Sequence, residues 1–461
     1  MVLSDVCELF LKQSPVAVMM RATLENVLSA ERLDALFAAQ ARRQRPSELL
    51  FSLVVDLLGT VVCGVRPSIH AAFQARSEEI GVSVKALYDK LRGIEPHVAR
   101  ELVRDASARM GQIVDAAEGR RPAWLPGYRV KILDGNHLPR SERRLKELRT
   151  RNVAPLPGHS LVLLDPERML VIDVFPCVDA YAHERSLLPE LLPTIERGDV
   201  LVADRNFSTT DFLGAIADRQ AGFVIRQHAA TLRWNSAGPR QRVGPIETGL
   251  VYEEPIVLLP EGGEPWQARR ITVVLNEPTR DGDREIHVLT NLPDQVGGCQ
   301  VAELYRRRWT LETAFGELES TLHGELQTLC YPQAALFAFC LALVAYNVLS
   351  VVKTALRTER GAEGAEDKIS GYYLADEAAG VWRGMMIVLP ADYWQQQFAD
   401  RSPRSMAIFL RHAARHVRLD AFRKHPRGPK KKPPNSMNKK HRTHVSTARI
   451  LQQRLSKLNK K

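Results

Sequence analysis

The sequence has few cysteines and no pattern that pairs them. Six cysteines are scattered over 461 residues, and none forms a C-x-x-C pair. They are Cys7, Cys63, Cys177, Cys299, Cys330 and Cys340. Neither a disulfide framework nor a clustered zinc site is therefore expected. A reducing compartment is the simplest location for such a chain.

A secretory leader is not expected, because the N-terminus lacks a basic start, an apolar run and a small-residue cleavage site. One stretch, 334–352, is apolar enough to suggest a membrane span, but it contains Tyr346, Asn347 and Ser350. We interpret it as a buried core helix. The sequence thus predicts a cytoplasmic, nucleoid-associated protein with no membrane partner.

Acidic residues are absent from 421–461, which holds 14 of the 64 Lys and Arg residues. The preceding 420 residues hold the other 50 bases and all 53 acids, a net charge of −3. This tail is rich in Pro and Lys and cannot bury enough apolar surface to fold alone. We favour a phosphate-binding arm that includes Lys430, Lys431 and Lys432 over a merely solubilising terminus.

Apolar periodicity divides the rest of the chain into five segments. Residues 1–125 and 356–420 have helical patterns. Residues 126–231 alternate strands with helices in the order of a ribonuclease-H-like core, which is an α/β fold, and 294–355 complete that core. Residues 232–293 are β-rich and punctuated by Gly and Pro. We expect them to form an inserted β domain that stands beside the sheet and takes no part in it.

Within the N-terminal helical segment, 67–93 resemble a helix-turn-helix. The pattern predicts a first helix ending near Ile80, a turn, and a second helix capped by Ser83. The second helix would display Lys85, Lys90 and Arg92 as DNA contacts. The alternative is a helical hairpin that only packs against its neighbours.

Three carboxylates stand where such a core could bring them together. Asp134 ends the strand in ILDGN, Asp204 ends the strand in VADRN, and Glu312 lies on a helix expected over 301–322. Strand ends at the carboxyl edge of an α/β sheet present ligands, and hard divalent cations prefer carboxylate oxygens. Each aspartate could instead form a turn or cap a helix.

Other acids compete for these positions. They are Asp165, Asp173 and Asp179 near strands, and Glu303, Glu317 and Glu319 on the same helix as Glu312. The spacing of Tyr305, Arg308 and Glu312 favours Glu312, because it places all three on one stripe of the helix. An arginine and a tyrosine beside a carboxylate suit a phosphate held against cations.

The segments ILDGN, VADRNFS and YRRRWTLE resemble the DDE transposases of bacterial insertion sequences. The resemblance is to the family with a tyrosine, arginine, glutamate, lysine signature. Tyr305, Arg308 and Glu312 fit that signature, whereas Glu319 stands at the place of the lysine. Arg306 or Arg307 could replace the lysine only from another helix face.

This resemblance implies a set of roles. Asp134, Asp204 and Glu312 would be catalytic and bind Mg²⁺, or Mn²⁺ in its place. Tyr305 and Arg308 would contact the DNA backbone of terminal inverted repeats and target DNA, and the active form would be a homodimer on DNA.

Family members with a β insertion can close a DNA hairpin with a flipped base. Trp234 and Trp266 are the base-stacking candidates, with packing as the alternative. His137 and His183 lie near the carboxylate motifs, where either could act as acid or base or be an exposed turn residue. No nucleophile is argued, because Ser208 and Cys177 have no evident base partner.

The sequence thus predicts a DNA transposase. The first alternative is a metal-dependent nuclease of the same fold that cuts DNA without joining it. The second is a DNA-binding regulator with an inactive core.

Overall fold

The computed structural model describes most of the chain. The described residues are 4–44, 49–138, 155–156, 158–179, 182–228, 232–279, 282–324, 326, 329, 331–364, 368–425, 445–446, 451–453 and 456–457. Lys430, Lys431 and Lys432 of the expected arm lie outside them.

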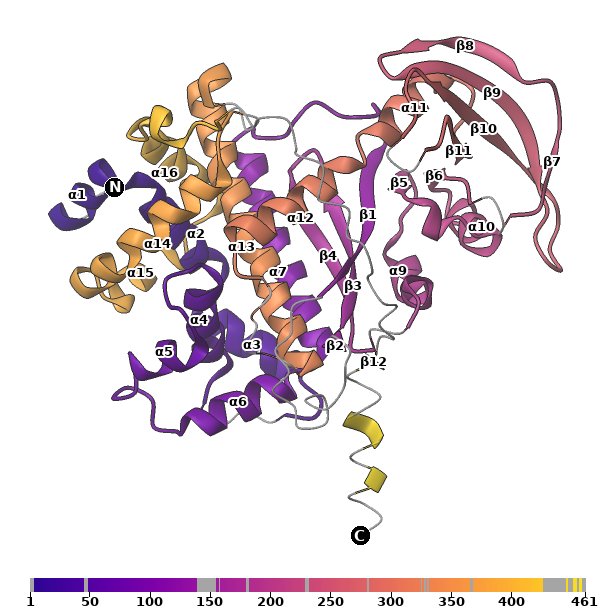
Figure 1. Cartoon of the computed structure of the whole chain (residues 1–461). Helices are drawn as coiled ribbons and strands as arrows, with labels where there is room; N and C mark the ends of the chain where they lie inside the picture. Colours follow the sequence, from indigo (N-terminus) through magenta and orange to yellow (C-terminus); the bar gives the residue numbers. More distant parts are fainter. Residues whose placement is uncertain are drawn as a thin grey trace, which may run out of the picture.

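A ten-stranded sheet forms the centre of the protein (Figure 1). Five of its strands have the order β4-β3-β1-β5-β6. β3 is antiparallel to both β1 and β4, whereas β1, β5 and β6 run parallel. The strands are β1 Arg129–His137, β3 His159–Asp165, β4 Leu170–Cys177, β5 Asp199–Ala203 and β6 Gly222–Arg226. This order confirms the ribonuclease-H-like α/β core.

The β-rich segment after β6 continues this sheet, so the expectation that it stands apart is wrong. Its last strand, β11, pairs antiparallel with β6, and β10, β9 and β7 follow outward while β8 pairs with β9. The strands are β7 Trp234–Ser236, β8 Gln241–Ile246, β9 Gly249–Leu258, β10 Trp266–Leu275 and β11 Glu285–Thr290. β6 would otherwise expose an unpaired edge, which β11 covers. The insertion lengthens the sheet without separating β1 from β5.

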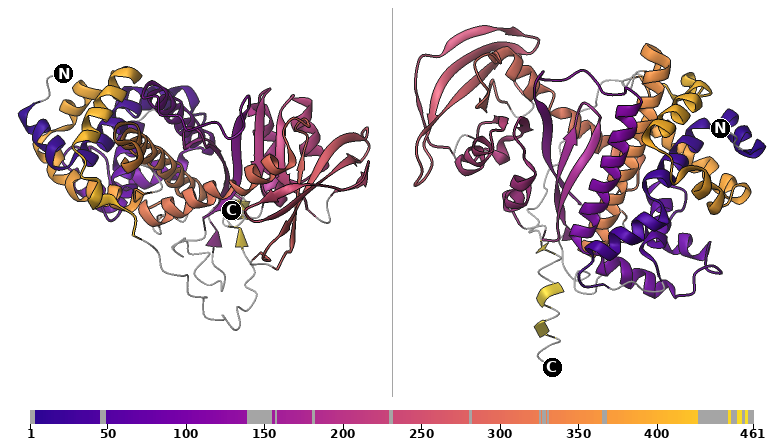
Figure 2. Two further views of the ribbon diagram at one scale, coloured as in Figure 1. Left: turned by 90° about the horizontal axis from the view of Figure 1, so that it is seen from above. Right: turned by 180° about the vertical axis from the view of Figure 1, so that it is seen from behind.

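Helices from the two ends of the chain lie together on one side of β1, β3 and β4, away from the insertion (Figures 1 and 2). Along β1, Ile132 faces the core shared with these helices and Leu133 faces the core on the other side. The helices are α1 Asp5–Gln13, α2 Pro15–Val27, α3 Ala30–Gln40, α4 Phe51–Val62, α5 Ile69–Gln74, α6 Val84–Gly93, α7 Pro96–Ala116, α13 Pro332–Arg360, α14 Gly371–Val388, α15 Ala391–Phe398 and α16 Pro403–Arg415.

The apolar helix α13 is the one described helix long and apolar enough to cross a membrane, and its apolar window is entirely buried inside the protein. This burial agrees with the expected core helix. The side-chain amide of Asn347 on α13 is buried but has hydrogen-bond partners. Its side chain accepts from Val171 N and donates to Val171 O, both at 2.8 Å. The amide thereby satisfies the edge backbone of β4, which would otherwise be buried without partners.

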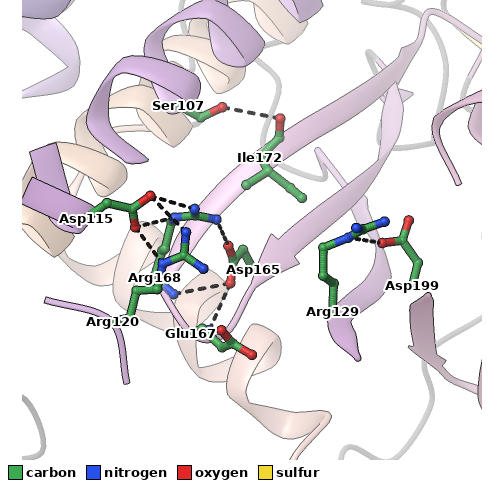
Figure 3. A network of polar contacts seen from close by, with 9 residues as sticks. All are labelled: Ser107, Asp115, Arg120, Arg129, Asp165, Glu167, Arg168, Ile172 and Asp199. Carbon is green, nitrogen blue, oxygen red and sulfur yellow. Dashed lines mark hydrogen bonds and ion pairs between the residues drawn. The ribbon is translucent and has the colours of Figure 1, made fainter. Parts of the chain in front are cut away.

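A polar network fixes α7 to the turn between β3 and β4 (Figure 3). Asp115 on α7 accepts from the guanidinium groups of Arg120 and Arg168, with distances of 2.7–3.0 Å. Arg168 also donates to Asp165 at 2.9 Å. The two cations hold the pKa of Asp115 well below its usual range despite partial burial. In the same view, Arg129 of β1 pairs with Asp199 of β5 at 2.8 Å.

The helix-turn-helix prediction needs correction. The first helix, α5, ends at Gln74 and not near Ile80, although Ser83 does cap α6 by accepting from Ala86 N. Lys90 is 8% exposed, and its ammonium lies 4.2 Å from the Phe37 ring centroid. Burial lowers the pKa of Lys90. Its position against Phe37 makes Lys90 a packing residue and contradicts its assignment to DNA.

The other two bases of α6 differ from each other. Arg92 pairs with Asp89 and lies 4.7 Å from the ring centroid of Tyr331. Lys85 is exposed. A DNA contact by α6 therefore stays a prediction for Lys85 and for Arg92.

Candidate active site

The two aspartates emerge from neighbouring parallel strands. Asp134 lies in β1. The residue before it, Leu133, pairs with Ala203 at the end of β5. Asp204 follows Ala203 directly and caps the short helix η3 (Arg205–Phe207) by accepting from Asn206 N at 2.8 Å. β5 ends before Asp204, whereas β1 continues past Asp134 to His137 and only its pairing with β5 stops at Leu133. Both aspartates thus reach the carboxyl edge of the sheet.

Glu312 reaches the same edge from a helix that is broken, not continuous as expected. α11 (Gly298–Arg306) ends in a tight turn, and α12 (Trp309–Thr321) begins after Arg308. Arg308 N donates to Tyr305 O and Leu311 N donates to Arg308 O. The single stripe predicted for Tyr305, Arg308 and Glu312 is therefore produced by two helices and the turn between them.

Arg308 joins two of the three carboxylates. Its Nη1 donates to Asp134 Oδ2 at 2.9 Å, and its Nη2 donates to Glu312 Oε1 at 2.6 Å. The Arg308 side chain is 9% exposed, that of Asp134 is 17% exposed, and that of Glu312 is 48% exposed. One buried guanidinium group therefore joins Asp134, which lies 174 positions away in the sequence, to Glu312, which lies 4 positions away.

The third carboxylate acts on this pair through its charge. The pKa of Asp134 is raised to about 6, chiefly by burial, with the negative charges of Asp204 and Glu312 acting in the same sense and Arg308 lowering it. Arg308 therefore does not offset the combined effect of burial and of the neighbouring carboxylates on Asp134. An added cation would be favoured there.

Tyr305 faces the same group of charges. It is 7% exposed, and burial raises the pKa of its phenol while the cations Arg308 and Arg226 lower it. Arg226, at the end of β6, donates to Asp283 at 2.6 Å. The two signature residues, Tyr305 and Arg308, thus lie together at the carboxylates.

A cavity of about 490 Å³ opens beside Asp134 and Glu312. Its lining includes Gly135, Asn136 and His323, and Asp204 is not among the lining residues. Among the residues that the structure describes, no group of three or more His, Cys, Asp or Glu side chains stands close enough to hold a metal ion. The three predicted ligands therefore do not surround a common point. Arg308 lies between two of them, Asp134 and Glu312.

The residues nevertheless fit a divalent cation. Carboxylate oxygens are the donors that Mg²⁺ prefers, and it binds proteins through one or two carboxylates while keeping water. The raised pKa of Asp134 comes first from burial and then from the charges of Asp204 and Glu312, and a bound cation would stabilise the ionised carboxylate against both.

Most of the competing acids have structural partners. Asp165 accepts from the backbone of its own turn, Asp173 pairs with Arg100 at 2.9 Å, and Glu303 pairs with Arg306 at 2.9 Å. Glu317 pairs with the buried Lys353 of α13 at 2.5 Å. The side chain of Glu319 lies outside the described residues. None of the four pairings is at the carboxylate site.

The two base-stacking candidates are packed against the second core cluster. The guanidinium carbon of Arg270 lies 4.8 Å from the Trp234 ring centroid. Trp266 meets Phe223 edge to face with the centroids 6.1 Å apart. This packing favours the structural alternative for both rings.

Cys177, His183 and His137, which the sequence analysis singled out, differ in their surroundings. The Cys177 thiol donates to the carbonyl of Asp179, and burial raises its pKa. His183 is exposed. His137, by contrast, lies 3.6 Å from the carboxylate of Glu184.

Two residues at the site were missed by the sequence reasoning. Glu184 in the short helix η1 (Glu184–Leu187) feels the charge of Asp204, and Trp309 is 65% exposed directly after Arg308. An exposed tryptophan is unusual, but its exposure cannot be read from a helical pattern. Glu184 lies in YAHERS, which gives no spacing signal toward either aspartate.

Comparisons with known proteins bear on this site. A family model described as the transposase DDE domain matches residues 126–348. The transposase for insertion sequence element IS421 of Escherichia coli is 27% identical over 205 residues, covering 37% of this chain and 55% of that protein. The InsL protein of element IS186A of E. coli K12 gives the same values. The chain thus spans about half the length of these relatives.

A cryo-EM structure of the piggyBac transposase synaptic complex with hairpin DNA is also similar. It has a TM-score of 0.39 and 11% identity, with 84% of each chain covered. The family match includes all three converging carboxylates. Residues 126–348 thus match the model of a transposase DDE domain, and Asp134, Asp204 and Glu312 all lie within the matched part.

Proposed function

We propose that the chain is a DNA transposase that cleaves at the ends of an insertion sequence and joins them to target DNA by metal-dependent phosphoryl transfer. The observation that carries the proposal is the Arg308 bridge between Asp134 and Glu312, with Asp204 acting on the same carboxyl. Residues far apart in sequence meet there in the charge pattern of a phosphoryl transfer site.

The proposed ion is Mg²⁺, with Mn²⁺ as a substitute, held by Asp134, Asp204 and Glu312. When bound, it supplies a Lewis acid that activates a water and stabilises the leaving oxygen of a phosphodiester. The guanidinium of Arg308 and the phenol of Tyr305 would hold a DNA phosphate beside the carboxylates, because a planar fork matches phosphate oxygens. We also propose that the chain is of the tyrosine, arginine, glutamate, lysine type, with Glu319 as its departure.

The proposed partners are the terminal inverted repeats and a target duplex, bound by a homodimer in the cytoplasm. The exposed Lys85 and the acid-free segment 421–461 support a polyanionic partner. The DDE domain and the relatives from insertion sequences support transposition over simple hydrolysis.

The test is cleavage and joining of a supercoiled plasmid that carries the inverted repeats flanking the reading frame, in Mg²⁺. Asp134→Asn, Asp204→Asn and Glu312→Gln should each reduce cleavage by about 10³-fold or more, and the triple variant should lose little more. Asp218→Asn removes an exposed acid from α10 (Thr210–Asp218) and should cleave normally.

The products separate the alternatives. Cleaved ends without joined products would identify a nuclease, and binding of the repeats without Mg²⁺-dependent cutting would identify a regulator. A Glu312→Gln protein that cuts at nearly the wild-type rate would overturn the site.

A further inference from the structure

A fourth carboxylate, Glu184, lies between the two chain segments that carry the catalytic aspartates. Its side chain is 17% exposed. One oxygen lies 3.6 Å from His137 Nε2, at the end of β1, and the other accepts from Asn206 Nδ2 at 3.4 Å. Glu184 therefore contacts the residue three positions after Asp134 and the residue two positions after Asp204.

The contact with β1 depends on a glycine. A Cβ added at Gly135 would come within 2.0 Å of Glu184 Oε1, closer than real Cβ contacts permit. The backbone of residue 135 is thus the surface on which the Glu184 carboxylate rests. Because Gly135 directly follows Asp134, the Glu184 carboxylate lies against the part of β1 that carries the first proposed catalytic aspartate.

The contact with the Asp204 turn is doubled by the next residue. Arg185 Nε donates to the Asn206 carbonyl at 2.5 Å, while Glu184 accepts from the Asn206 side chain. Asn206 N in turn donates to Asp204 Oδ1 at 2.8 Å. The helix η1 therefore holds the residue whose backbone orients the Asp204 carboxylate.

Burial and the negative charge of Asp204 raise the pKa of Glu184, with His137 acting in the opposite sense. A buried acid close to another acid is costly for folding alone, and groups placed at such a cost are typical of functional sites.

We propose that Glu184 is a positioning residue of the active site, which braces Gly135 and Asn206 so that Asp134 and Asp204 face a common cation. The proposal rests on the metal-dependent function proposed above. Groups that orient metal-binding carboxylates typically contribute 10-fold to 100-fold to metal affinity. The role is one of placement, so a neutral side chain of the same shape should fulfil much of it.

The experiment measures Mn²⁺ binding to the full chain by electron paramagnetic resonance, with thermal unfolding as the check on folding. Glu184→Ala should weaken Mn²⁺ binding by roughly 10-fold to 100-fold, and Glu184→Gln, which can still accept from Asn206, should restore most of it. Gly135→Ala should weaken binding similarly with Glu184 in place, because its Cβ displaces the carboxylate. The control Glu190→Ala removes an exposed acid nearby and should bind normally.

The possible results separate the positioning role of Glu184 from the proposed metal site itself. Glu184→Ala and Gly135→Ala proteins that bind Mn²⁺ as tightly as Glu190→Ala would overturn the positioning role. A Glu184→Gln protein as weak as Glu184→Ala would also overturn it, in favour of a role for charge. If Glu184→Ala does not fold, Gly135→Ala decides alone. Mn²⁺ binding that survives Asp134→Asn would contradict the proposed metal site itself.

Discussion

Arg308 occupies the space between two predicted metal ligands, so its removal should strengthen metal binding. Its guanidinium donates to Asp134 and Glu312. A cation that engages both carboxylates must compete with it. The variant Arg308→Gln removes the competing charge and keeps a polar side chain of similar length.

The magnitude follows from the exposure of the partners. Removing one member of a buried ion pair costs about 3–5 kcal/mol, whereas exposed pairs contribute about 0–1 kcal/mol. Asp134 is mostly buried and Glu312 is about half exposed. We therefore expect Arg308→Gln to lower the free energy of unfolding by about 2–3 kcal/mol without metal. A competing interaction of about 2 kcal/mol corresponds to a roughly 30-fold difference in apparent Mn²⁺ affinity.

The assay is Mn²⁺ titration of the wild type and of Arg308→Gln, read by paramagnetic resonance and by the rise in melting temperature. The variant should melt lower without metal and gain more from Mn²⁺. Arg306→Gln is the matched control, because Arg306 pairs with Glu247 and Glu303 and does not touch the site. Equal or weaker Mn²⁺ binding by Arg308→Gln would refute the competition.

Three further predictions concern other parts of the chain. Trp309→Ala should weaken binding of element ends by about 1–3 kcal/mol with little change in melting temperature, since the ring is exposed and directly follows Arg308; unchanged affinity in a fluorescence anisotropy titration would contradict it. Asp115→Asn should destabilise the protein by about 1–2 kcal/mol at neutral pH. Because the pKa of Asp115 is depressed in the folded state, this loss should fade as the pH falls below about 4; a pH-independent difference in urea denaturation would refute the linkage. Deleting 421–461 should reduce the slope of log affinity against log salt by roughly 6 if half of its 14 bases touch phosphates, and an unchanged slope would remove the arm.

The sequence alone was sufficient for the core. Runs of apolar residues bounded by turn residues predicted the strands, and the order of strands and helices along the sequence predicted the α/β class. Asp204 was predicted from the same pattern, because an acid that directly follows an apolar strand leaves the sheet at its edge. Asp134 was found by the same rule, although β1 continues to His137 and only its pairing with β5 stops before Asp134. The burial of α13 also followed from composition.

Long-range contacts were decided by the tertiary structure alone. Pairing of β11 with β6 made the insertion part of the sheet, and no local pattern specifies which edge an antiparallel strand will cover. The same limit applies to side chains. The helical pattern predicted Lys90 on an exposed face, whereas it packs against Phe37, and the pattern did not indicate that Arg308 pairs with Asp134 and Glu312. Periodicity reports the face of an element on which a residue lies, whereas its partner depends on how distant elements pack.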